Sequence, residues 1–181
     1  MAIEVAELVT MALKVGIAGY GLAGRYFHAP LLRGCGYEVS AILTSNEVRK
    51  AHALVDFPHT TVVSNIEELV SIDLDLVVVA SANIAHADQA IAALNAGIPV
   101  VVDKPMGRNL EETQQIIDTS IAVGVPVTTF FNRRWDSDAL TIKKVLASGA
   151  LGDTSCLIIG NRRFSASKWS GQLSPAWIFV Q

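Results

Sequence analysis

The sequence predicts an α/β protein, a doubly wound parallel sheet with helices on both faces. Short apolar runs bounded by turn residues, such as Leu76–Ala80, alternate with segments of helical patterning. Such runs are typical of strands buried on both faces of a parallel sheet. A glycine-rich stretch follows the first run directly, and polar residues follow several of the others. Together these features predict βαβ units with a ligand site at the strand ends.

The strands are expected where apolar runs stop at turn-forming residues. The first begins near Leu13 and ends at the glycine-rich stretch. A seventh strand would follow the six that complete a Rossmann-type sheet. The later strands are expected at Tyr37–Leu43, around Thr61–Val63, and at Leu74–Ala80, Pro99–Val102, Val127–Phe130 and Thr154–Ile159.

Capping residues and glycines delimit the helices between these strands. Ser64 with Glu67, and Asn109 with Glu112, have the spacing of residues that begin a helix. Glycines at Gly34–Gly36, Gly97, Gly124 and Gly149 are expected to end helices. The expected helices are about Gly24–Arg33, Glu47–Leu54, Ile66–Ser71, His86–Asn95, Leu110–Val123 and Ser137–Ser148.

The sixth strand and its helix are complete near Gly149–Asp153, where we expect a domain boundary. Residues 1–10 carry Glu4 and Glu7 and no basic cluster, so they do not resemble a signal peptide. They are expected to be a dispensable extension before Met11. The predicted organisation is therefore an extension over 1–10, a Rossmann domain over 11–150 and a further segment over 151–181.

Bulk composition excludes several classes of function. The chain has 181 residues, 51% of them hydrophobic and 17% charged, and a net charge of −3. Mild acidity gives no reason to expect nucleic acid or an anionic membrane as partner, and the apolar runs are too short to cross a bilayer. The two cysteines, Cys35 and Cys156, lie in unrelated contexts, which fits a reducing cytoplasm. His52 and His59 lack metal-ligand spacing, so no metal site is predicted.

Gly19, Gly21 and Gly24 form a Gly-x-Gly-x-x-Gly motif directly after the first apolar run. Such a loop makes a tight turn, lets backbone N–H groups approach a pyrophosphate, and brings the following helix close to the strand. Because a helix N-terminus also attracts phosphate, the whole loop, including Leu22 and Ala23, is expected to bind a dinucleotide.

The residues after the second strand bear on the choice of cofactor. An NAD site usually places an acidic residue there to accept from the ribose hydroxyl. Here Thr44 and Ser45 occupy that place, and Arg49 lies one turn into the next helix. Small hydroxyl residues beside a cation favour NADP over NAD, although Arg49 alone would also fit an ordinary solvated helix face.

Three further strand ends carry polar residues that the topology should bring to the same edge of the sheet. A lysine held at such an end, here Lys104, can hydrogen-bond a substrate hydroxyl and serve as a catalytic group, or it can simply pair with Asp103 on the surface. His86 is either a neighbour of substrate and nicotinamide or a polar residue at a helix start. The expected cofactor-binding residues at these ends are Ala80, Ser81, Asn83, His86, Asp103, Lys104, Asn132 and Arg133.

Four stretches together resemble the Gfo/Idh/MocA family of oxidoreductases: Gly16–Gly24, Val77–His86, Val101–Pro105 and Asn132–Asp136. The third is similar to the Glu-Lys-Pro signature of that family, with Asp103 in place of glutamate. The resemblance covers about Leu13 to Phe164. It implies an NAD(P)-dependent enzyme acting on sugars, polyols or related carbonyl compounds, with Lys104 as its active-site lysine.

The chain also departs from this family. Members are about twice as long, and a second α+β domain covers the nicotinamide, supports oligomers and supplies a proton-transferring histidine. No histidine follows His86 in this sequence. The resemblance therefore implies a truncated member with only the stub of that domain over 151–181. The tail beyond about Phe164 is expected to be poorly ordered or to mediate self-association.

Two functions follow as alternatives. One is an oxidoreductase of the family type, and the other is a non-catalytic NAD(P)-binding module that lacks most of the substrate pocket. A third reading, a different Rossmann ligand such as S-adenosylmethionine, is disfavoured by the Asp103-Lys104-Pro105 and Asn132-Arg133 matches. The isolated chain is expected to have low or no activity.

Overall fold

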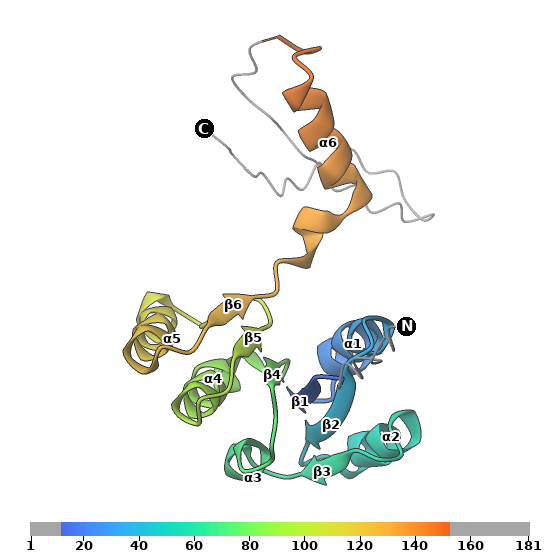
Figure 1. Ribbon diagram of the computed structural model, residues 1–181, viewed down its shortest axis with the longest axis vertical. Coiled ribbons are helices and arrows are strands. Elements are labelled where there is room, and N and C mark those ends of the chain that lie inside the picture. Colours follow the sequence, from blue (N-terminus) through green and yellow to red (C-terminus); the bar gives the residue numbers. More distant parts are fainter. Residues whose placement is uncertain (1–11, 153–181) are drawn as a thin grey trace, which may run out of the picture. The chain divides into compact units, whose positions relative to one another are not determined.

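The computed structural model describes residues 12–152, which contain a six-stranded parallel sheet in the order β3-β2-β1-β4-β5-β6. Neighbouring strands pair in parallel throughout, as in the doubly wound sheet that the sequence predicts (Figure 1). The strands are β1 (Lys14–Ala18), β2 (Glu38–Leu43), β3 (Thr61–Val63), β4 (Leu76–Val79), β5 (Val100–Val102) and β6 (Val127–Thr129).

Helices cover both faces of the sheet, and each face has its own apolar core (Figure 1). One core contains Ile17, Tyr20 and Leu32 and lies beneath η1 (Gly24–His28), α1 (Ala29–Gly34) and α2 (Glu47–Asp56). The other contains Leu69, Leu94 and Ile116 and lies beneath α3 (Ile66–Val70), α4 (His86–Asn95) and α5 (Leu110–Val123). The strand order changes direction between β1 and β4, so the helices before and after this point lie on opposite faces of the sheet, as in a doubly wound fold.

Beyond the last residue of each strand, the hydrogen-bond ladder continues by one step. Gly19 N donates to the Leu43 carbonyl at 2.9 Å, Ala80 N to Ala18 at 2.8 Å and Asp103 N to Val79 at 2.8 Å. Thr44 and Phe130 make the same bond to the strands beside them. The residues that follow the strands therefore form one aligned edge, which we call the strand-end rim.

Most helix ends agree with the sequence, and two details differ. The N-terminal cap of α3, predicted from Ser64 and Glu67, is shifted by one residue. Asn65 caps the helix by accepting from Glu68 N, and the Glu68 carboxylate accepts from Ser64 N. The helix after the glycine loop contains a π-helical turn, η1, in which Ala29 N donates to the Gly24 carbonyl. By contrast, Asn109 and Gly124 begin and end α5 as predicted.

The chain divides into two compact units between Phe131 and Asn132. The described part of the second unit contains η3 (Asn132–Trp135) and α6 (Ser137–Ala147). The domain boundary expected at Gly149–Asp153 lies further along the chain and stays a prediction. The extension over 1–10, the strand Thr154–Ile159 and the associating tail fall outside the described residues.

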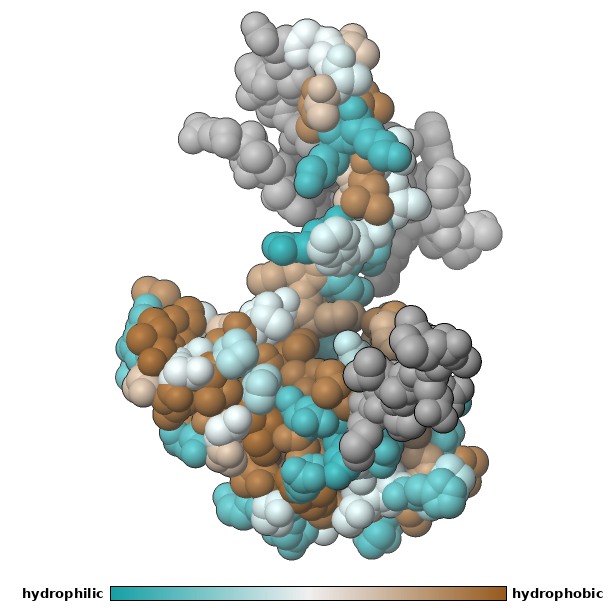
Figure 2. All heavy atoms as spheres, in the orientation of Figure 1, coloured by the Kyte–Doolittle hydropathy of each residue, from teal (hydrophilic) through white to brown (hydrophobic). Residues whose placement is uncertain are grey.

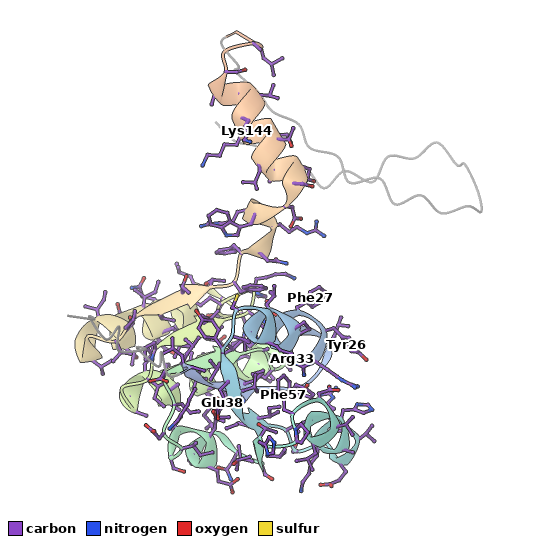
Figure 3. All side chains as sticks on the ribbon, turned by 45° about the vertical axis from the view of Figure 1, so that its right-hand side comes forward. Tyr26, Phe27, Arg33, Glu38, Phe57 and Lys144 are labelled. Atoms are coloured by element: carbon purple, nitrogen blue, oxygen red, sulfur yellow. The ribbon has the colours of Figure 1, made fainter. Side chains whose placement is uncertain are left out.

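Apolar side chains also reach the surface. Figure 2 shows hydrophobic residues mixed with polar ones over α4 and α5. On the other face of the sheet, Tyr26 and Phe27 project outward from the helix that follows the glycine loop (Figure 3). Within residues 12–152, none of the helices has the length and apolar character needed to span a membrane.

Candidate functional site

The glycine loop joins β1 to η1 at the centre of the strand-end rim. Gly19 adopts φ +99°, and a Cβ there would lie 2.5 Å from Ser81 Cα, because the loop after β4 crosses it closely. A Cβ on Gly24 would lie 2.0 Å from the Gly19 carbonyl oxygen. The motif therefore permits a positive φ and a close backbone approach at the two positions where a side chain would not fit.

Gly21 is open on its outer side. A Cβ placed there would meet the Arg49 guanidinium at 3.7 Å, an ordinary contact distance. A bare backbone beside a guanidinium, next to helix N–H groups that have no intrahelical acceptors, is a cradle suited to phosphate. These residues fit the phosphates of a dinucleotide, as the motif predicts.

The turn after β2 places Thr44 and Ser45 next to this cradle. Thr44 is buried, and its Oγ1 accepts from Asn46 N at 3.3 Å. Ser45 is exposed, and Asn46 caps α2 by accepting from Arg49 N. The cap fixes the first turn of α2, which carries Arg49 toward Gly21. From the sequence, Arg49 fits either a cation beside a ribose phosphate or an ordinary surface residue, and its proximity to Gly21 could not be predicted from spacing alone.

Behind the cradle, a polar cluster of Tyr20, Arg25 and Asp56 joins the glycine loop to the end of α2. Tyr20 Oη donates to Asp56 Oδ2 at 2.9 Å, and Arg25 Nε donates to the same oxygen at 2.7 Å. Burial and the carboxylate raise the pKa of the Tyr20 phenol, and the Arg25 guanidinium lowers the pKa of Asp56. The sequence offered no local signal for this cluster, because its members lie far apart in the chain.

Arg33 reinforces the same connection. Its guanidinium donates to the Asp56 carbonyl at 2.7 Å and lies 4.6 Å from the centre of the Phe57 ring, and both side chains are seen between the helices in Figure 3. The C-terminal end of α2 is thus held by two arginines of the glycine-loop helix. The position of α2, and with it that of Arg49, is set by these contacts.

At the end of β4, the loop carrying Ala80, Ser81 and Asn83 leads through η2 (Asn83–Ala85) into α4. Ser81 Oγ donates to Gln89 Oε1 at 2.7 Å. The His86 ring is 1% exposed, with Nδ1 2.8 Å from the Pro105 carbonyl and Nε2 3.2 Å from the Ser81 carbonyl. Of the two roles considered for His86, this geometry favours a residue at a helix start that ties two loops of the rim together.

The end of β5 carries the Asp103-Lys104-Pro105 turn, in which the Lys104–Pro105 peptide is cis. Asp103 Oδ1 accepts from Lys104 N at 2.8 Å, so the carboxylate bonds the backbone of the lysine. Among the described residues, the Lys104 side chain is exposed and its ammonium forms no ion pair. The alternative of a lysine paired with Asp103 on the surface is therefore not what the structure shows.

Asn132 and Arg133 lie in the second unit, so their place relative to the rim stays a prediction. Arg133 Nη1 donates to Asp136 within that unit at 3.2 Å. A shallow cavity of about 570 Å³ is lined by α5 residues alone, none of which follows a strand end: Leu110, Glu111, Gln114, Gln115 and Asp118. Within residues 12–152 there is no cluster of three or more His, Cys, Asp or Glu suited to a metal ion.

Comparison with known proteins places this geometry among oxidoreductases. Residues 13–131 match the Gfo/Idh/MocA family model, described as an oxidoreductase family with an NAD-binding Rossmann fold. The scyllo-inositol 2-dehydrogenase (NADP(+)) IolW of Bacillus subtilis is 38% identical over 156 residues, which cover 84% of this chain and 42% of the relative. The uncharacterized oxidoreductase YdgJ of Escherichia coli is 40% identical over 144 residues, covering 79% and 41%.

Solved structures agree with the sequence matches. The apo scyllo-inositol dehydrogenase from Lactobacillus casei has a TM-score of 0.72 at 25% identity, over 78% of this chain and 43% of that one. The chain spans about two fifths of the length of the curated relatives it matches. The matched part is the part that contains the strand-end rim.

Proposed function

The chain belongs to the Gfo/Idh/MocA oxidoreductase family, and we propose that it binds NADP(H) across the glycine loop and serves hydride transfer to or from a sugar or polyol. The observation that carries the proposal is the open backbone at Gly21 with the Arg49 guanidinium beside it. The loop offers N–H donors to a pyrophosphate, and Arg49 offers a cation within reach of the same place.

The preference for NADP over NAD rests on the turn after β2. A free ribose hydroxyl is usually bound by a carboxylate acceptor, whereas a phosphate is bound by cations and hydroxyl donors. Thr44, Ser45 and Arg49 supply the second set. The relative IolW carries NADP(+) in its name, which agrees with this assignment.

Lys104 is the residue we propose for the chemistry. When bound, a nicotinamide accepts or supplies the hydride at the substrate carbon. Lys104 projects from the rim at the end of β5, and its ammonium can donate to the substrate oxygen whose proton must leave or arrive. Inositol dehydrogenases among the relatives support a polyol as the substrate class.

Cofactor binding can be tested with a variant that is expected to keep the fold. Gly21→Ala adds a methyl group that has room against Arg49 yet occupies the surface where phosphate would approach. Titration with NADPH and NADH, followed by nicotinamide fluorescence, should show saturable binding to the wild type and a large loss in Gly21→Ala. Gly34→Ala is the matched control, because a Cβ there meets nothing within 4 Å. Equal binding by all three proteins would contradict the proposal.

A second candidate function is a non-catalytic cofactor-binding module. It is favoured by the exposure of the Lys104 side chain, which forms no ion pair among the described residues. Steady-state reduction of NADP⁺ with a panel of inositols and sugars separates the candidates. Turnover that is lost in Lys104→Met while NADPH binding persists supports the enzyme, and binding without turnover supports the module.

A further inference from the structure

His28 is a buried polar residue that the proposed chemistry does not use. Its ring is 4% exposed and lies 4.4 Å from the centre of the Phe130 ring. Its Nε2 is buried without a hydrogen-bond partner among the described residues, and it faces Asp103 Oδ2 at 3.8 Å. Leaving a buried imidazole nitrogen without a hydrogen-bond partner costs free energy, so its position opposite a carboxylate indicates a role for the pair.

The backbone brings His28 to this place from the glycine-loop helix. His28 is the last residue of η1, the π-helical turn that begins at Gly24. Such turns inside α-helices change the direction of side chains and are frequent at functional sites. Asp103 and Phe130 are the residues directly after β5 and β6, held there by hydrogen bonds to the neighbouring strands. His28 therefore connects the helix of the glycine loop with the ends of two strands.

We propose that His28 is a positioning residue for Lys104, acting through the Asp103 carboxylate. One oxygen of that carboxylate bonds Lys104 N, and the other faces the imidazole. The imidazole, packed against Phe130, thus faces the carboxylate whose other oxygen fixes the start of the Asp103-Lys104-Pro105 turn. This role rests on the proposed function, in which the same helix meets the cofactor and the same turn carries the reactive lysine.

The electrostatics agree with this arrangement. Burial lowers the pKa of His28, while the Asp103 carboxylate acts in the opposite sense. A neutral imidazole can carry its proton on Nε2, and a carboxylate opposite that atom favours the tautomer that donates to it. Asp103 is the charged group that acts on the ring, and the Phe130 ring packs against it at 4.4 Å.

The pairing can be tested by NMR without any cofactor, so its outcome is independent of the proposed function. The chain has four histidines, and His28→Gln assigns the His28 signal in a titration of the wild type. If the carboxylate faces the ring in solution, Asp103→Asn should lower the His28 pKa. An unchanged His28 titration in Asp103→Asn would overturn the pairing.

The positioning role has its own readout, the amide signal of Lys104, whose N–H bonds Asp103. His28→Leu should shift this signal and speed its hydrogen exchange by about tenfold, while His28→Gln, which retains a donor, should restore the wild-type values. His59→Gln, at an exposed histidine, is the control for a remote change. A Lys104 amide that is the same in His28→Leu as in the wild type would contradict the proposal.

Discussion

The two halves of the strand-end rim are built differently. The half around β1 and β2 carries the phosphate cradle, and the Tyr20, Arg25 and Asp56 cluster supports it from behind. The half around β4 and β5 carries Lys104, which is exposed, on a turn that His86 and Asp103 hold through backbone bonds. In the first half, charged and polar side chains are therefore paired with one another, whereas in the second half the Lys104 side chain is exposed.

In the proposed function, this difference separates binding from chemistry along one edge of the sheet. In the first half, the side chains of Tyr20, Arg25 and Asp56 are held by one another behind the glycine loop, so the backbone that would meet a ligand is supported before the ligand binds. In the second half, the Lys104 backbone is held by Asp103, whereas its side chain is exposed. Substitutions in the supporting residues of the first half should therefore change folding, substitutions on its open face should change affinity, and substitutions at Lys104 should change turnover alone.

The largest effect is expected from Gly24→Ala. Its Cβ would lie 2.0 Å from the Gly19 carbonyl oxygen, a backbone atom that cannot move without opening the loop. We expect a loss of about 3 kcal/mol or more in the free energy of unfolding, together with loss of NADPH binding. Urea denaturation followed by circular dichroism measures it, with Gly34→Ala as the neutral control. An unchanged midpoint in Gly24→Ala would show that the loop does not close as described.

Asp56→Ala should have the next largest effect. It removes the acceptor of the buried Tyr20 hydroxyl and of Arg25, so we expect a loss of about 2 kcal/mol in stability. The matched control is Asp73→Ala, which removes an ion pair with Lys14 whose Asp73 side chain is 92% exposed, and which should change stability much less. Equal losses in the two variants would contradict the supporting role of the cluster.

The same cluster predicts a dependence on pH. Arg25 lowers the pKa of Asp56 below its ordinary value of 3.8 in the folded protein. The carboxylate therefore stabilises the fold fully above that value, and this contribution is lost as the pH falls through the lowered pKa. Denaturation of the wild type and Asp56→Ala should show a constant difference near neutrality that shrinks below pH 3.8. If the stability difference between the wild type and Asp56→Ala widened below pH 3.8, the pKa of Asp56 would not be lowered in the folded protein.

The smallest predicted change is one of selectivity. Arg49→Gln should weaken NADPH binding by about tenfold and leave NADH binding and stability nearly unchanged, because only the phosphate would lose a charged partner. Lys50→Gln, the next residue along α2, tests for a general effect of charge. If both substitutions weaken NADPH equally, the contact between Arg49 and the loop does not decide selectivity.

Residue patterns predicted the strands, the glycine loop and most helix ends, because these depend on local periodicity, caps and positive-φ glycines. The shift of the cap from Ser64 to Asn65 shows the limit of that approach, since neighbouring polar residues compete for one role. The cluster around Asp56 and the buried ring of His86 depend on contacts between distant segments. Spacing in a single sequence carries no signal for such contacts.

Amide hydrogen exchange of the chain with and without NADPH tests the cofactor site most directly. Binding of NADPH should slow exchange in the glycine loop, 19–25, and in the turn and first residues of α2, 44–49. Exchange in α5, which lines the cavity outside the rim, should stay the same. Protection confined to α5, or none in the loop at saturating NADPH, would contradict the assignment of the rim as the cofactor site.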